Sequence, residues 1–90
     1  MAELFKVLVV DDEEYNRLLF KTILERWGVE CHVAVNGVEA IEMVKTGKYD
    51  LLFMDIRMPG IDGLKVTQFI RNELGISAKE MPVICITAAS

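Results

Sequence analysis

The chain of 90 residues lacks the features that define several common classes of protein. No apolar run approaches the roughly 18 residues that a helix needs to cross a bilayer, so we expect no membrane association. The segment from Met1 to Lys6 has no basic cluster ahead of an apolar stretch and does not resemble a secretory signal. With 52% hydrophobic and 27% charged residues, the composition favours one globular domain over residues 1–90, which we expect in the cytoplasm.

Cysteine, histidine and clusters of basic residues are also scarce. Cys31 and Cys85 each lie inside an apolar segment and form no C-x-x-C pair, so we predict buried, reduced thiols rather than a disulfide. A zinc site is not expected with only one histidine. The net charge is −4 and the lysines and arginines are scattered, which argues against nucleic-acid binding by this segment.

What the chain does contain is a regular alternation of strand-like and helix-like segments. Continuous apolar runs predict buried strands, and apolar residues at helical spacing predict amphipathic helices. The strand predicted at 29–35 differs, because Glu30 and His32 alternate with apolar residues and indicate an edge strand with one wet face. The predicted strands are 5–10, 29–35, 49–54 and 83–86, and the predicted helices are 13–27, 38–46 and 62–74.

Helix ends and inward faces follow from the same pattern. Gly28 and Gly75 are placed to end the first and third helices. The second helix should carry Val38, Ile41 and Val44 on one face, and the third should point Val66, Ile70 and Leu74 inward. Strands that alternate with helices predict an α/β fold with a parallel sheet and right-handed crossovers.

Polar residues occur where three of the predicted strands end. Asp11 and Asp12 follow the first strand, Asp55 follows the third, and Thr87 follows the fourth. The carboxyl ends of adjacent parallel strands share one edge, so three carboxylates converge if the first and third strands are neighbours. Such carboxylates repel one another unless a cation joins them, and oxygen ligands at an open edge suit Mg²⁺. Asp55 would then be an ionised nucleophile for phosphorus, and Thr87 could donate its hydroxyl.

Simpler interpretations exist for each of these residues taken alone. An acidic pair after a strand is often a helix cap, and an Asp that ends a strand is often a turn residue. Thr87 could be an ordinary threonine at a strand end. The joint placement of these residues on three successive buried strands favours a common site.

Three motifs resemble the receiver domain of two-component response regulators, and the resemblance covers all 90 residues. They are VLVVDD at 7–12, LFMDIRMPGIDG at 52–63 and PVICITA at 82–88. The resemblance implies a flavodoxin-like, doubly wound parallel sheet with strand order 2-1-3-4. Asn16 and Arg17 additionally resemble receivers attached to hybrid histidine kinases.

The resemblance also implies specific roles. Asp55 is the expected phosphoacceptor, and it takes the group from a histidine kinase or a histidine phosphotransfer domain. Asp11, Asp12, Asp55 and the backbone carbonyl of Arg57 are the expected Mg²⁺ ligands. Thr87 is expected to contact the phosphoryl group and to move in the activation switch. The backbone N–H of Ala88 is expected to bind the phosphoryl group. The domain would be a phosphoacceptor that assists its own transfer and not a turnover enzyme.

One departure from the family pattern affects these expectations. The family has a fifth strand and two last helices, and a lysine at the end of the fifth strand. None of these is found in the 90 residues, so we expect a receiver that is incomplete at its C-terminus. The fourth strand would then be an exposed apolar edge, which favours a homodimer through that edge. If such a fragment acts as an assembly module, its phosphorylation would be slow or absent.

Two other functions are compatible with parts of the pattern. A phosphohydrolase of the haloacid dehalogenase type also uses an Asp nucleophile with Mg²⁺. That family needs a second Asp two positions after the nucleophile, where this chain has Arg57. The other alternative is a truncated, phosphorylation-impaired fragment that acts as an assembly or dimerisation module.

Overall fold

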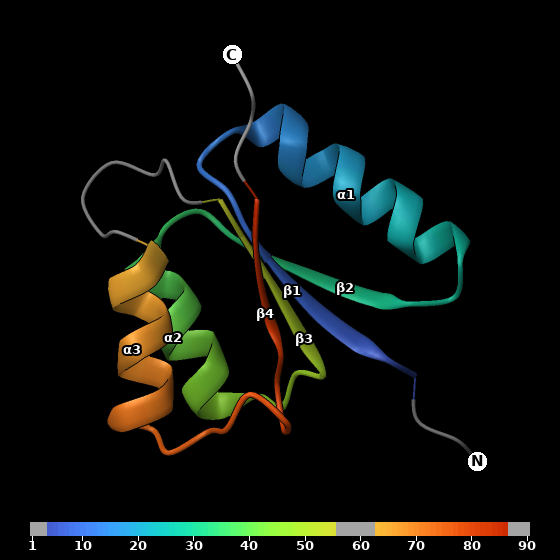
Figure 1. Ribbon diagram of the computed structural model, residues 1–90. Coiled ribbons are helices and arrows are strands. Elements are labelled where there is room, and N and C mark those ends of the chain that lie inside the picture. The colour runs from blue at the N-terminus through green and yellow to red at the C-terminus, as the bar shows by residue number, and fades with distance from the viewer. Residues whose placement is uncertain (1–3, 56–62, 87–90) are drawn as a thin grey trace.

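The computed structural model describes residues 4–55 and 63–86, and it shows strands and helices in strict alternation (Figure 1). No helix among these residues is long and apolar enough to span a membrane. The strands are β1 (Lys6–Val10), β2 (Glu30–Ala34), β3 (Leu51–Asp55) and β4 (Val83–Ile86). The helices are α1 (Glu14–Arg26), α2 (Gly37–Thr46) and α3 (Gly63–Asn72). All seven segments predicted from the sequence are confirmed, with small shifts of their ends.

The four strands form one parallel sheet in the order β2-β1-β3-β4. This order confirms the predicted flavodoxin-like arrangement, in which β1 and β3 are direct neighbours. Val10 pairs with Met54, so the residues that follow β1 lie beside the end of β3. β2 is an edge strand, as the alternation of Glu30 and His32 predicted.

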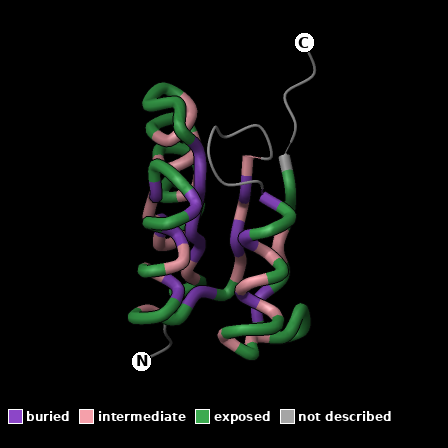
Figure 2. Tube along the Cα trace, turned by 90° about the vertical axis from the view of Figure 1, so that its left-hand side faces the viewer, coloured by how far each residue is buried: buried purple, intermediate pink, exposed green. Residues whose placement is uncertain are grey.

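The sheet separates two helical layers (Figure 1). Successive side chains of β1 point to opposite faces of the sheet. Leu8 and Val10 therefore pack into the core between the sheet and the helices α2 and α3. Val7 and Val9 pack on the opposite face, where partly buried Phe20 of α1 completes a smaller cluster. Figure 2 shows that burial is concentrated on the inner sides of the layers, while the outer turns of the helices are exposed.

The third helix is bound to the sheet as predicted. Val66 and Ile70 are fully buried and Leu74 is partly buried against the same core.

The prediction for α2 was wrong in one respect, because Val38 is 58% exposed while Ala40 and Val44 carry the buried face. Val38 directly follows buried Gly37, so it lies about 100° around the helix from the face that Gly37, Ala40 and Val44 form.

The prediction of two buried cysteines was wrong for Cys85. Cys31 is buried on the α1 face, whereas Cys85 is exposed, and both thiols are free. Cys85 belongs to β4, which lies at the edge of the described sheet, and its neighbour Ile84 is 44% exposed. Cys31 also lies on an edge strand, β2, but Phe20 and Leu24 of α1 pack in the same cluster. Burial of an apolar strand residue therefore depends on what covers its face, and apolar sequence alone does not guarantee it.

Candidate functional site

Three carboxylates meet at the carboxyl edge of the sheet. Asp11 and Asp12 directly follow β1, and Asp55 is the last residue of β3. One oxygen from each carboxylate can be chosen so that all three lie within 4.8 Å of one another. Asp11 is only 6% exposed, Asp55 is half-buried and Asp12 faces solvent. The structure therefore brings together the acidic residues that the sequence predicted for a metal site.

Local hydrogen bonds hold Asp11 in place. Its backbone N–H donates to the carbonyl of Ala34 in β2 over 3.1 Å, which extends the strand pairing by one residue. Its carboxylate atom Oδ1 accepts the backbone N–H of Glu13 over 2.9 Å. This second contact is a local turn between residues two positions apart. The N-cap residue of α1 is Glu13, whose side chain makes no cap hydrogen bond, so neither residue of the acidic pair caps the helix. The turn and a shared acidic site are compatible, because the contact uses one of the two carboxylate oxygens of Asp11.

The donor set matches the preferences of Mg²⁺. Three ionised carboxylates this close together repel one another, and a divalent cation between them offsets that repulsion. The ligand atoms are all hard oxygens, and no described histidine or cysteine joins the group. Solvent-facing Asp12 leaves the edge open to water, which Mg²⁺ retains in its coordination shell.

Three of the predicted site residues lie outside the described residues. These are Arg57 with its backbone carbonyl, Thr87, and Ala88 with its backbone N–H. β4 runs parallel to β3, and its last residue, Ile86, pairs with Asp55. The end of β4 is thus at the same edge of the sheet as the carboxylates.

Arg17 contacts this edge, which the sequence pattern did not predict. The guanidinium atom Nη1 donates to the backbone carbonyl of Asp11 over 2.9 Å. In the sequence, Arg17 stands out only as part of the Asn16-Arg17 resemblance to receivers of hybrid kinases. The signal available in the sequence was its position on the first turns of α1, where a long basic side chain can reach back to the preceding loop.

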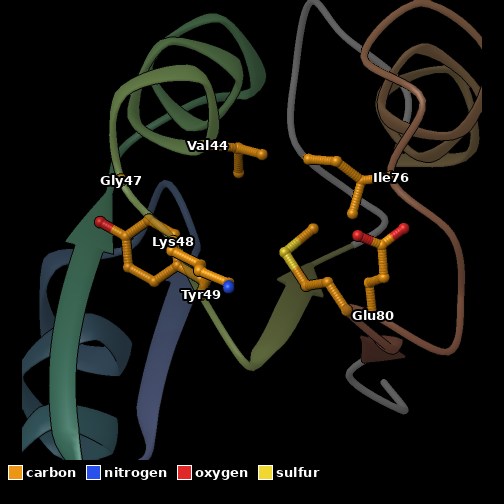
Figure 3. A pocket seen from close by; sticks show the side chains of 7 residues that line it. Val44, Gly47, Lys48, Tyr49, Ile76 and Glu80 are labelled. Atoms are coloured by element: carbon orange, nitrogen blue, oxygen red, sulfur yellow. The ribbon is translucent and has the colours of Figure 1, made fainter. Parts of the chain in front are cut away.

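A small cavity of about 100 Å³ lies at the other end of the sheet (Figure 3). Tyr49 and Met81 line it, and each precedes a strand, whereas the carboxylates follow strands. Glu80 stands at its rim, and its carboxylate accepts the backbone N–H of Ser77, which lowers the pKa of the Glu80 carboxyl. The cavity is remote from the acidic edge and is not part of this site.

The fold and the acidic edge together define a class of protein. An open parallel α/β sheet with polar residues beyond the carboxyl ends of its strands is the arrangement of flavodoxin-like ligand and ion sites. Residues 7–90 match the family described as response regulator receiver domain. The chain belongs to this family, as its three motifs predicted.

Individual relatives agree with this assignment. The chain is 39% identical over 87 residues to hybrid signal transduction histidine kinase G of Dictyostelium discoideum, which covers 94% of this chain and 2% of the kinase. It is 35% identical over 82 residues to the polar-differentiation response regulator DivK of Brucella anthropi, covering 91% of this chain and 65% of DivK. The chain thus spans a small part of the hybrid kinase and about two thirds of DivK.

A solved structure shares the fold and much of the sequence. The response regulator TrrA of Thermotoga maritima, in complex with Mg²⁺-BeF, superposes with a TM-score of 0.84 and is 41% identical, covering 97% of this chain and 72% of TrrA. TrrA has also been solved in complex with the histidine kinase ThkA, where the TM-score is 0.82 and the identity 42%, with the same coverage.

Proposed function

We propose that this chain is a phosphoacceptor of a two-component phosphorelay and that Asp55 carries the phosphoryl group. The observation that carries the proposal is the convergence of Asp11, Asp12 and Asp55 at one sheet edge. Their carboxylates, with the backbone carbonyl of Arg57, would hold Mg²⁺. When bound, the metal would offset the repulsion of the carboxylates and the charge on the phosphoryl oxygens.

We assign the nucleophile to Asp55 because it stands in the motif that resembles the phosphoacceptor motif of receiver domains. It is the half-buried last residue of β3, at the same edge as Asp11 and Asp12. An oxygen of Asp55 attacks phosphorus, a P–O bond forms, and the P–N bond to the donor imidazole breaks. The imidazole leaves and takes up a proton. The hydroxyl of Thr87 and the backbone N–H of Ala88 would stabilise the transferred group by donating hydrogen bonds.

The proposed donor is a phosphohistidine on a histidine kinase or a histidine phosphotransfer domain. TrrA, which is 42% identical, was solved with a histidine kinase, and the relative from Dictyostelium is named as a hybrid histidine kinase. The chain would be consumed and regenerated in the relay, so it is a substrate that assists its own transfer and not a turnover enzyme.

Phosphoramidate tests this proposal, because its P–N bond has the chemistry of phosphohistidine without requiring the cognate kinase. The chain is incubated with phosphoramidate and Mg²⁺, and its intact mass is measured. The proposal predicts one added phosphoryl group, lost when EDTA removes the metal and absent from Asp55→Asn. Glu73→Gln removes one exposed acidic charge elsewhere and should be phosphorylated like the parent. A folded parent chain that gains no phosphoryl group would contradict the proposal.

A second function is favoured by the position of β4. It lies at the edge of the described sheet, and Ile84 and Cys85 on it are exposed. An exposed apolar edge pairs readily with another strand, so the 90-residue chain is proposed to dimerise through β4. Light scattering across a range of concentrations tests this. Ile84→Lys should give a monomer, while Val38→Lys, which changes an exposed valine of α2, should leave the dimer intact.

A further inference from the structure

Arg17 contacts the acidic edge from outside the group of carboxylates. It lies in the first turns of α1, is half-buried, and directs its guanidinium back toward the loop between β1 and the helix. Atom Nη1 donates to the backbone carbonyl of Asp11 over 2.9 Å. The backbone N–H of Arg17 donates to the carbonyl of Glu13 over 3.1 Å, so the residue is fixed to the same loop by two contacts.

The contact completes the hydrogen bonding of Asp11. Its N–H is bound to Ala34, its Oδ1 accepts from Glu13, and its carbonyl accepts from Arg17. The carbonyl of Asp11 and the N–H of Asp12 belong to one planar peptide group. Because the guanidinium fixes the direction of this carbonyl, it also fixes the orientation of the peptide plane that contains the N–H of Asp12. Asp12 itself is exposed, so the direction of its side chain depends strongly on how this peptide is held.

The charge of Arg17 works against cation binding, so it cannot be the source of a gain in Mg²⁺ affinity. Its guanidinium is positively charged and lies next to the loop that carries Asp11, Asp12 and Glu13. A fixed positive charge here offsets part of the repulsion among these carboxylates before any cation binds and repels the cation itself, so a loss of affinity without Arg17 would report lost orientation. The guanidinium presents its N–H donors in one rigid plane and can hold a carbonyl in a fixed direction, which a lysine ammonium does not.

We infer that Arg17 is a positioning residue for the acidic edge, which it prepares for a divalent cation by fixing the peptide between Asp11 and Asp12. This inference rests on the proposed Mg²⁺ site and deepens it. A group that orients metal ligands without touching the metal typically changes metal affinity by about 10–100-fold when it is lost. A purely structural contact would instead lower the stability of the metal-free fold and leave the affinity of the folded protein unchanged.

Titration of Mg²⁺ followed by the NMR shifts of the Asp11, Asp12 and Glu13 amides separates these roles. Arg17→Gln should raise the dissociation constant on the order of tenfold in protein that remains folded. Arg17→Lys retains the charge and one donor and should recover part of the affinity. Arg26→Gln removes the same charge from the other end of α1 and should bind Mg²⁺ like the parent. If Arg17→Gln does not fold, Arg17→Lys decides the question through a dissociation constant that is weaker than the parent's.

The outcomes distinguish this inference from the proposed function. A parent chain that binds Mg²⁺, together with folded Arg17→Gln and Arg17→Lys variants of parental affinity, overturns the role of Arg17 and leaves the phosphoacceptor proposal standing. A folded parent that binds no Mg²⁺ overturns both. Equal weakening by Arg26→Gln would show that the effect does not come from the contact with Asp11, and would also overturn the inference.

Discussion

The hydroxyl of Tyr49 lies 2.9 Å from Nδ1 of His32, and this hydrogen bond joins the edge strand β2 to the segment that leads into β3. The other ring nitrogen of His32 lies 2.8 Å from Glu30 Oε2. The two rings meet edge to face with centroids 5.5 Å apart, and Lys6 Nζ lies 5.2 Å from the centre of the Tyr49 ring. Tyr49 is 6% exposed, so this network closes the end of the sheet opposite the carboxylates.

Tyr49→Phe should therefore destabilise the fold. The ring and its packing remain, but the hydrogen bond to His32 is lost, at an expected cost of about 1 kcal/mol in the free energy of unfolding. Urea denaturation measures this, and a double-mutant cycle with His32→Ala isolates the coupling between the two side chains. Costs that simply add in the double variant would show that the two residues do not interact.

Stability should fall at alkaline pH because two acids are buried. Burial raises the pKa of the Tyr49 hydroxyl, and Glu30 raises it further. Burial also raises the pKa of the Cys31 thiol, although Lys21 partly opposes this. The folded protein keeps these protons where the unfolded chain has lost them, so their contribution is present below the unfolded-chain pKa and is lost as pH rises through the folded pKa.

The free energy of unfolding should thus decline above about pH 8.5. Tyr49→Phe and Cys31→Ala should each show a shallower decline than the parent, whatever they cost at neutral pH. Tyr15→Phe removes the hydroxyl of a tyrosine that is 72% exposed, and its curve should follow the parent's. Parallel pH curves for all four proteins would contradict the assigned origin of the alkaline loss.

Burial predicts a difference between two isoleucines in helices. Ile70 of α3 is fully buried, whereas Ile23 of α1 is 43% exposed. Ile70→Val should cost about 1 kcal/mol because it removes a buried methyl group and leaves a void, and Ile23→Val should cost less than about 0.5 kcal/mol. Thermal or urea denaturation compares the two. Equal costs would mean that α1 is packed as tightly as α3, contrary to the structure.

Asp12→Asn should have opposite effects with and without metal. In EDTA it relieves repulsion among the carboxylates and should raise the free energy of unfolding by up to about 1 kcal/mol. In saturating Mg²⁺ the parent gains stability because the cation binds only the folded state, and the variant should gain much less. Glu73→Gln should respond to Mg²⁺ like the parent. A variant that gains as much as the parent would remove Asp12 from the metal site.

The sequence predicted the architecture because strand identity depends on local pattern. The apolar run at 7–10 and its acidic ending locate β1, and the motif around Asp55 locates the end of β3. Once β1 and β3 are neighbours, parallel pairing places Asp11, Asp12 and Asp55 together. The order of strands came from the family resemblance, since alternation alone leaves several orders open.

The errors arise where burial depends on neighbours and not on local pattern. Cys85 and Cys31 stand in similarly apolar segments, yet only Cys31 lies under a helix. Val38 fits the helical spacing of Ile41 and Val44, but the buried face of α2 is formed by Gly37, Ala40 and Val44, and Val38 lies to one side of it. The contact from Arg17 to Asp11 depends on a side-chain conformation, which spacing does not determine.

The identity of the carboxylate that carries the phosphoryl group tests the central claim most directly. The chain is phosphorylated with phosphoramidate and Mg²⁺, and borohydride then reduces the acyl phosphate to an alcohol that survives proteolysis. Peptide mass spectrometry locates the reduced position. The account predicts reduction at Asp55, with Asp11 and Asp12 unchanged. Reduction at Asp11 or Asp12 while Asp55 stays intact, or no reduction in a folded, Mg²⁺-binding chain, would contradict it.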